Sequence, residues 1–252
     1  MKNTLNSGYV FWFLFILNLG LPFLSYTIPE FRLPIHYGNI SDVITYIGIL
    51  FLIYNNLGDA RNYHIDKSVT IYLVLAGLVL IVISITVSLV LTIIFLTSGI
   101  FVIKRIYLRL KSASIDLFSA SLFKELLLYS IIGGFLGVVI FLISPRFVFD
   151  KNQLDHLWIK FIIEFGKSAV NEEILLRGFL WGYLKNKHWN ETTILVFQAL
   201  TFSFGHISYY GNIEISIRIF VTGLLLGIVA WKLRSVTPGI IAHALANTLV
   251  YL

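Results

Sequence analysis

The sequence contains no cysteine and few charged residues. None of its 252 residues is Cys, and Asp, Glu, Lys and Arg together make up 13% of the chain, about half of their share in ordinary globular domains. Without cysteine, the chain can form no disulfide, iron–sulfur cluster or thiolate zinc site, and it has no cysteine nucleophile. The charged residues are too few to cover the surface of a soluble protein of this size, so the surface of this protein must be apolar.

In place of charged residues, the chain contains long apolar runs. The hydrophobic share is 58% and the mean hydropathy is +0.86. The runs lack the alternation typical of membrane β-strands, and a spanning helix needs about 20 apolar residues. The expected fold class is all-α, a polytopic transmembrane helix bundle with about eight spans, within a range of seven to nine. The runs are 8–28, 41–57, 69–103, 126–144, 157–184, 192–210, 217–233 and 238–252.

The run 69–103 is too long for a single bilayer crossing. As one helix it would measure about 52 Å at about 1.5 Å per residue, against a hydrocarbon core of about 30 Å. It is either one long tilted helix or two short helices joined by a tight turn. We favour the long helix because no proline interrupts the run.

The net charge of +6 is explained by membrane topology. Lys and Arg fall mainly in short loops, as expected for the cytoplasmic side, where we place the loops around Lys185/Lys187 and Lys232/Arg234. No basic run is interleaved with aromatic residues in the manner of a nucleic-acid-binding protein. The expected partner is therefore the lipid bilayer and not nucleic acid.

Three ionisable residues, Glu172, Glu173 and Arg177, lie in the middle of the run 157–184. One ionised side chain at the bilayer centre costs roughly 2.5–3.5 kcal/mol on insertion scales, so these residues must face the bundle interior or a wet cavity. Glu173 and Arg177 are four residues apart and can pair on one helix face, which would lock the fold. Glu172 is rotated by about 100° from Glu173 and has no second cation within one turn, which makes it the candidate for chemistry.

Two histidines lack a structural explanation. His206 and His243 lie within predicted spans, and Asn247 follows His243 by four residues and shares its helix face. A single histidine on an apolar face is more often structural. Two histidines with an asparagine and an unpaired glutamate favour a shared intramembrane cavity, which the depths counted along the helices allow.

Three Gly-xxx-Gly spacings predict close approach of membrane helices. We favour packing within the chain over dimerisation. The pairs are Gly133/Gly137, Gly178/Gly182 and Gly223/Gly227.

The polar residues resemble the three motifs of the CPBP intramembrane proteases, which include CAAX prenyl endopeptidases and bacterial bacteriocin-processing or self-immunity proteins (Abi-type). The resemblance covers about residues 155–252 and implies a catalytic core of about four transmembrane helices there. Residues 1–150 are expected to be N-terminal transmembrane helices without diagnostic motifs. The motif stretches are EEILLR with Glu172, Glu173 and Arg177, FSFGH with Phe202 and His206, and HALAN with His243 and Asn247.

The resemblance implies a role for each motif residue. Glu172 would be the general base that polarises a water molecule together with His206, while His243 and Asn247 would orient the water or stabilise the oxyanion. Structural support would come from Glu173, Arg177 and Phe202. Zinc is a further expectation, because Glu172, His206 and His243 form an acceptable ligand set. The family is described both as metal-dependent and as glutamate-dependent, so metal use stays open.

The expected function is an intramembrane endopeptidase for hydrophobic or membrane-proximal peptides, in a multi-pass protein of the bacterial plasma membrane. The alternative is a non-catalytic scaffold or bacteriocin self-immunity protein with the same fold. A transporter with a carboxylate proton relay is disfavoured, because the helices of Glu172 and His206 lack the broken, repeated architecture of carriers. Signatures of other intramembrane proteases are missing: the sequence has no His-Glu-x-x-His, and Asp42, at the edge of its run, is the one aspartate within a predicted span.

Overall fold

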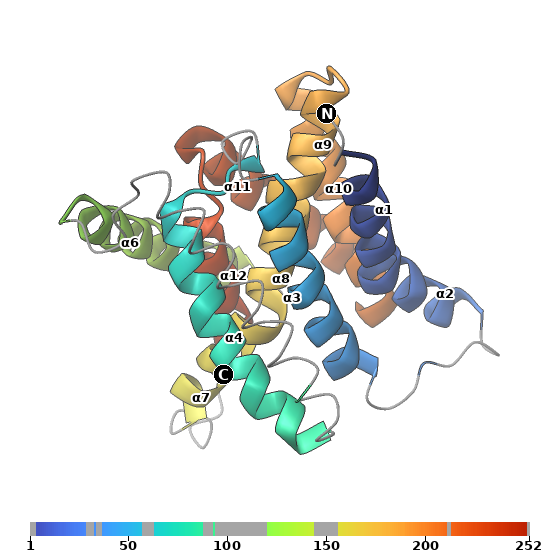
Figure 1. The fold of residues 1–252 in the computed structure, drawn as a ribbon, viewed down its shortest axis with the longest axis horizontal. Coiled ribbons are helices and arrows are strands. Elements are labelled where there is room, and N and C mark those ends of the chain that lie inside the picture. Colours follow the sequence, from blue (N-terminus) through green and yellow to red (C-terminus); the bar gives the residue numbers. More distant parts are fainter. Residues whose placement is uncertain are drawn as a thin grey trace.

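The computed structural model describes residues 4–28, 33, 37–56, 63–87, 93, 120–143, 156–210 and 213–250. Every regular element within these ranges is a helix (Figure 1), which confirms the all-α expectation for the described part of the chain. The first half contains α1 (Thr4–Phe15), the π-helical turn η1 (Ile16–Gly20), α2 (Leu21–Thr27), α3 (Tyr37–Asn55) and α4 (Lys67–Val87). The second half contains α6 (Ala120–Ile143), α7 (Leu157–Glu164), η4 (Phe165–Ala169), α8 (Val170–Glu173), η5 (Ile174–Leu180), α9 (Trp181–Asn186), α10 (Glu191–Tyr210), α11 (Ile213–Leu233) and α12 (Thr237–Val250).

These elements correspond to the predicted apolar runs. Because α1 to α2 follow one another without a break, as do α7 to α9, the described elements form eight continuous helices, one in each run. Among the described residues, three segments are long and apolar enough to cross a membrane, namely Ser7–Ser25, Ala120–Ile143 and Ile213–Leu233. The count of about eight spans stays a prediction.

The long run 69–103 is only partly described. Its first part lies in α4, which begins at Lys67 and ends at Val87. Residues 88–103, apart from Ile93, lie outside the described residues. The choice between one long helix and two short ones therefore stays a prediction.

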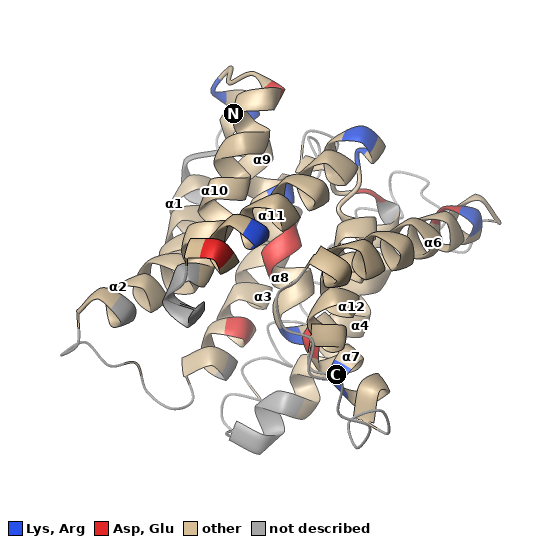
Figure 2. Cartoon of the chain, turned by 180° about the vertical axis from the view of Figure 1, so that it is seen from behind, with Lys and Arg blue, Asp and Glu red and all other residues tan. Residues whose placement is uncertain are grey.

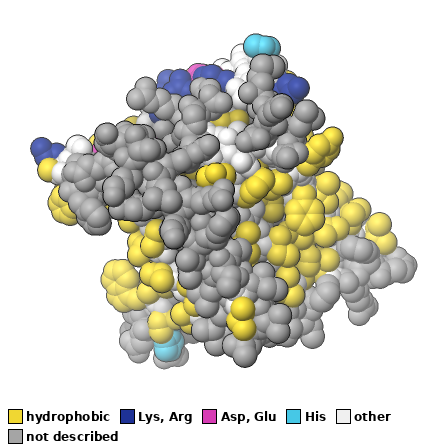
Figure 3. Space-filling model, in the orientation of Figure 1, with side chains coloured by type: hydrophobic (Ala, Val, Ile, Leu, Met, Phe, Trp, Pro, Cys, Tyr) yellow, Lys and Arg dark blue, Asp and Glu magenta, His cyan; other side chains and the backbone are white. Residues whose placement is uncertain are grey.

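Large apolar side chains are exposed along the flanks of the bundle. Phe135 on α6 is 73% exposed and Trp158 on α7 is 78% exposed. Figure 3 shows a broad hydrophobic flank, with Lys and Arg side chains gathered toward one end of the molecule. Apolar patches of this kind are unfavourable in water and suit the hydrocarbon of a bilayer.

Glu191, the first residue of α10, holds the ends of three helical segments together. Figure 2 shows Lys and Arg residues at the end of the bundle near α9. Lys185 of α9 and Trp231 of α11 both donate hydrogen bonds to its carboxylate, and Arg234 lies 3.2 Å away. The Lys185 hydrogen bond is the main reason that the pKa of Glu191 falls to about 2. The two loops that we placed on the cytoplasmic side therefore meet at one face.

The predicted glycine pairs are used for packing within the chain. A Cβ atom on Gly133 would lie 2.7 Å from the carbonyl oxygen of Pro238 at the start of α12, and one on Gly182 would lie 2.1 Å from the Tyr63 ring. Gly223 meets the backbone of α10 in the same way. Close approach of helices at small residues is the expected behaviour in membrane bundles, and it confirms intramolecular packing.

Candidate active site

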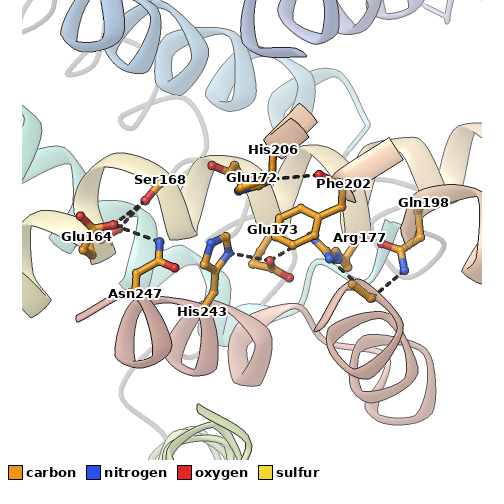
Figure 4. A network of polar contacts seen from close by, with 11 residues as sticks. Glu164, Ser168, Glu172, Glu173, Arg177, Gln198, Phe202, His206, His243 and Asn247 are labelled. Atoms are coloured by element: carbon orange, nitrogen blue, oxygen red, sulfur yellow. Dashed lines mark hydrogen bonds and ion pairs between the residues drawn. The ribbon is translucent and has the colours of Figure 1, made fainter. Parts of the chain in front are cut away.

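The continuous helix 157–186 carries most of the candidate residues and is not a regular α-helix. The four residues of α8, which include Glu172 and Glu173, lie between the π-helical turns η4 and η5. Short π-helical segments occur frequently at functional sites, and the apolar pattern of the sequence does not predict them. Figure 4 shows the polar side chains of this helix in a row between α10 and α12.

Glu172 lies beside His206 of α10, as the sequence predicts. The Glu172 Oε2 and His206 Nε2 atoms are 4.0 Å apart. The His206 Nδ1 atom is 2.8 Å from the carbonyl oxygen of Phe202. Because a carbonyl only accepts, Nδ1 carries the hydrogen, and Nε2 of the neutral ring turns its lone pair toward the carboxylate. At this spacing one water molecule can donate to both acceptors.

Glu173 joins two of the predicted site residues to each other. Its Oε1 accepts hydrogen bonds from Arg177 Nη1 at 3.0 Å and from His243 Nδ1 at 2.9 Å. Glu173 and Arg177 are fully buried, and His243 is 4% exposed. The predicted Glu173–Arg177 pair is confirmed. The sequence grouped His243 with Glu172, whereas the structure gives its Nδ1 to Glu173.

The start of α12 provides room for the Glu173 carboxylate. A Cβ atom on Gly239, the third residue of α12, would lie 2.8 Å from Glu173 Oε2. The carboxylate therefore lies against the first turn of a helix, where the macrodipole favours negative charge. The absence of a Cβ atom at Gly239 is what leaves space for this carboxylate.

Phe202 packs among three of the site's side chains. Its ring centre lies 4.4 Å from that of His206 and 5.6 Å from that of His243, and the Arg177 guanidinium stands 4.3 Å above its ring. The tilted contact with His206, the edge-on contact with His243 and the stacked cation together restrain both imidazoles. The supporting position expected for Phe202 thus has a geometric basis.

Asn247 has a partner that the sequence did not predict. Its Nδ2 donates to Glu164 Oε2 at 3.0 Å, and Ser168 Oγ donates to the same oxygen at 3.0 Å. Glu164 lies eight residues before Glu172, which is about two helical turns. An ionisable residue within an apolar run is the signal that could have identified it.

A cavity of about 380 Å³ opens beside Glu172 and His206. Its polar lining includes Asp42 of α3, and Glu164, Lys167 and Asn171 of the continuous helix 157–186. Glu172 and His206, whose Oε2 and Nε2 atoms are 4.0 Å apart, both line this cavity. Asp42 was noted in the sequence only for its position, and Lys167 and Asn171 were not assigned to the site.

The residues expected to bind zinc do not form a metal site in the described part of the chain. No three His, Asp or Glu side chains there come together as a group that could hold a metal ion. Zinc needs ligand atoms at about 2.0–2.2 Å, and His243 Nδ1 is bonded to Glu173 instead. The present arrangement of these side chains does not fit zinc.

Comparison with known proteins gives one match. Residues 154–249 match the family model described as type II CAAX prenyl endopeptidase Rce1-like. No match was found among curated proteins or among solved structures. The matched segment contains all seven motif residues from Glu172 to Asn247, and the apolar helices are those of a membrane protein. Residues 154–249 are therefore similar to the Rce1-like type II CAAX prenyl endopeptidases, a family of proteases, in agreement with the CPBP resemblance of the motifs.

Proposed function

We propose that this protein is an intramembrane endopeptidase of the plasma membrane that cleaves hydrophobic or membrane-proximal peptides. The observation that supports the proposal best is the 4.0 Å approach of Glu172 Oε2 and His206 Nε2 beside the cavity. Two acceptors at this spacing can bind one water molecule and orient its oxygen. In a site enclosed by apolar helices, a carboxylate is a suitable general base for that water.

The proposed reaction begins with the water bound between Glu172 and His206. Glu172 accepts a proton as the water oxygen bonds to the carbonyl carbon of the peptide, and the carbonyl electrons move to oxygen. The Asn247 N–H that Glu164 does not use donates to this oxyanion, together with Nε2–H of a protonated His243. The intermediate then collapses, the C–N bond breaks, and the leaving amine takes the proton from Glu172.

The neighbouring side chains are proposed to hold these groups in position. His243 can donate to the oxyanion through Nε2 only when both ring nitrogens carry hydrogen. Glu173 Oε1 lies 2.9 Å from Nδ1 and orients that ring, and Arg177 at 3.0 Å holds the Glu173 carboxylate in place. Phe202 restrains both imidazoles. Glu173 and Arg177 thus act through His243 and do not touch the peptide.

The test is proteolysis by the full-length protein in lipid nanodiscs, combined with comparative peptidomics of cells that contain or lack it. Glu172→Ala and His206→Ala should each lower cleavage by roughly 100-fold or more, with unchanged insertion. Glu214→Gln, which alters an exposed carboxylate paired with Arg218, is the charge-matched control. Full cleavage by Glu172→Ala would refute the mechanism, and an unchanged biological effect in that variant would favour the scaffold or self-immunity role.

Zinc dependence is tested separately. The mechanism proposed here predicts that protein stripped with a chelator keeps its cleavage rate, and that added zinc does not raise it. Loss of the rate on stripping and recovery with zinc would instead support the ligand set Glu172, His206 and His243. That result would require the hydrogen bond between His243 and Glu173 to break.

A further inference from the structure

The cavity beside Glu172 contains a carboxylate that the proposed mechanism does not use. Asp42 of α3 lines the cavity with Glu172 and His206. Its backbone carbonyl accepts a hydrogen bond from Asn171 Nδ2 at 3.1 Å, and Asn171 is the residue before Glu172. Within the described ranges, the Asp42 carboxylate has no hydrogen bond and no ion pair within 4.0 Å, and Lys167 of the same cavity acts on it only from a longer distance. An ionisable side chain inside a membrane protein without such a partner indicates a ligand.

Asn171 gives a second, independent indication of a ligand that donates hydrogen bonds. The residue is 2% exposed and lines the same cavity. Both of its amide hydrogens are used, because Nδ2 donates to the carbonyls of Asp42 at 3.1 Å and Lys167 at 3.0 Å. This fixes the orientation of the amide. Its Oδ1 is buried and accepts no hydrogen bond from the described residues, an arrangement that proteins rarely tolerate without a donor.

The charges around the cavity favour a positively charged ligand. The lining includes three carboxylates, Asp42, Glu164 and Glu172, and one lysine, Lys167, so its formal charge is −2 with neutral His206. Glu164 is already hydrogen-bonded to Asn247 and Ser168. Lys167 offsets part of this charge, and the remaining negative charge is shared by Asp42 and Glu172.

We propose that Asp42 and the Oδ1 atom of Asn171 form a subsite for a positively charged side chain of the substrate, the ammonium of lysine or the guanidinium of arginine. Both groups donate several hydrogen bonds and carry the charge that the cavity lacks. Because Asn171 adjoins Glu172 and an extended peptide advances about 3.3 Å per residue, the basic residue lies within two residues of the cleaved bond. The inference rests on the proposed proteolytic function and names its substrate class.

The experiment uses full-length protein in nanodiscs with EDTA present, and N-acetylated, internally quenched hydrophobic peptides that differ at one residue near the centre. That residue is Lys, Arg, norleucine or Glu. Wild type should cleave the Lys and Arg peptides roughly tenfold or more faster, by kcat/KM, than the norleucine peptide. Asp42→Asn should remove this preference, so that the Lys, Arg and norleucine peptides are cleaved at equal rates, and Asp42→Lys should shift the preference to the Glu peptide.

Matched variants separate recognition from folding. Asp42→Glu should keep the preference for Lys, and Glu214→Gln, which removes one negative charge outside the cavity, should leave every rate unchanged. A loss in Asp42→Asn that is equal for all four peptides, with a lowered melting temperature, would show a structural role and overturn the proposal. So would a wild-type protein that cleaves the Lys and norleucine peptides equally.

Binding gives a readout that does not require hydrolysis. Fluorescently labelled versions of the Lys and norleucine peptides are titrated into the Glu172→Ala protein and into the same protein with Asp42→Asn added. The Lys peptide should bind roughly tenfold more tightly in the first protein and equally in the second. Equal binding in both would refute the subsite, whereas tighter binding without cleavage by wild type would refute only the proposed function.

Discussion

Glu164 accepts hydrogen bonds from Asn247 of α12 and Ser168 of its own helix, each at 3.0 Å. The contact joins two helices that meet along the site (Figure 4), and it determines which way the Asn247 amide points. One N–H of Asn247 faces Glu164, which leaves the other for the proposed oxyanion.

We expect Glu164→Leu to lower kcat by roughly 10- to 100-fold with a smaller effect on KM, since a misplaced donor loses transition-state contact more than binding. Glu164→Gln keeps an acceptor oxygen and should retain most of the rate, and Ser168→Ala serves as the control for the other donor. A double-mutant cycle measures the coupling. In the Asn247→Ala background, Glu164→Leu should have little further effect; additive losses would contradict the positioning role.

Glu173 should be required for folding as well as for activity. Removing its charge leaves Arg177 buried at 0% exposure without a counterion, which costs roughly 3–5 kcal/mol. We expect Glu173→Gln to lower the thermal unfolding temperature of the detergent-solubilised protein clearly. Glu214→Gln breaks an exposed pair of the same spacing, worth at most about 1 kcal/mol, and should leave that temperature nearly unchanged. Equal shifts in the two variants would argue against a buried ion pair.

Two neighbouring glycines of α6 provide a matched test of the contact with α12. A Cβ atom on Gly133 would lie 2.7 Å from the Pro238 carbonyl oxygen, whereas one on Gly134 meets nothing within 4 Å. Gly133→Ala should therefore separate the two helices and reduce both stability and cleavage. Gly134→Ala should be neutral or stabilising, by up to about 1 kcal/mol from helix propensity. Thermal unfolding and cleavage rates measure the difference; a reversed order would show that α6 and α12 do not pack as described.

His64, which lies between α3 and α4, should make stability depend on pH. The ring is fully buried against Trp181, with ring centres 5.0 Å apart. Burial, with a smaller contribution from Arg234, lowers the pKa of His64 to about 4.

Acid should destabilise the fold, because on acidification His64 binds a proton at a higher pH in the unfolded chain than in the folded chain. As the pH is lowered below about 6.5, His64 is protonated in the unfolded state but not in the folded state. The free energy of unfolding therefore decreases until the pH reaches about 4. We expect a loss of roughly 2 kcal/mol between pH 7 and pH 5 from this residue alone. The His64→Asn variant, in which asparagine tolerates the local φ of 52°, should lose that part of the slope in denaturant titrations. An unchanged slope would show that His64 is not the group responsible.

The sequence by itself determined the solvent, the helices and the list of candidate residues. Scarce charge and long apolar runs require a membrane bundle, and the eight runs correspond to eight continuous helices in the described part of the chain. The pairing of Glu173 with Arg177 could be predicted because residues four apart share a helix face. Glu172 and His206 were identified because placing a polar side chain in hydrocarbon costs free energy, so such a side chain indicates a functional site.

Only the tertiary structure decided which of these groups meet. His243 pairs with Glu173 at 2.9 Å, Asn247 pairs with Glu164 at 3.0 Å, and Asp42 faces the cavity from α3. The π-helical turns on either side of α8 also came from the structure. Such contacts depend on the rotation and depth of separate helices, which side-chain packing sets. Hydropathy along one chain specifies that a polar residue must turn inward, but the partner that it meets there depends on every helix around it.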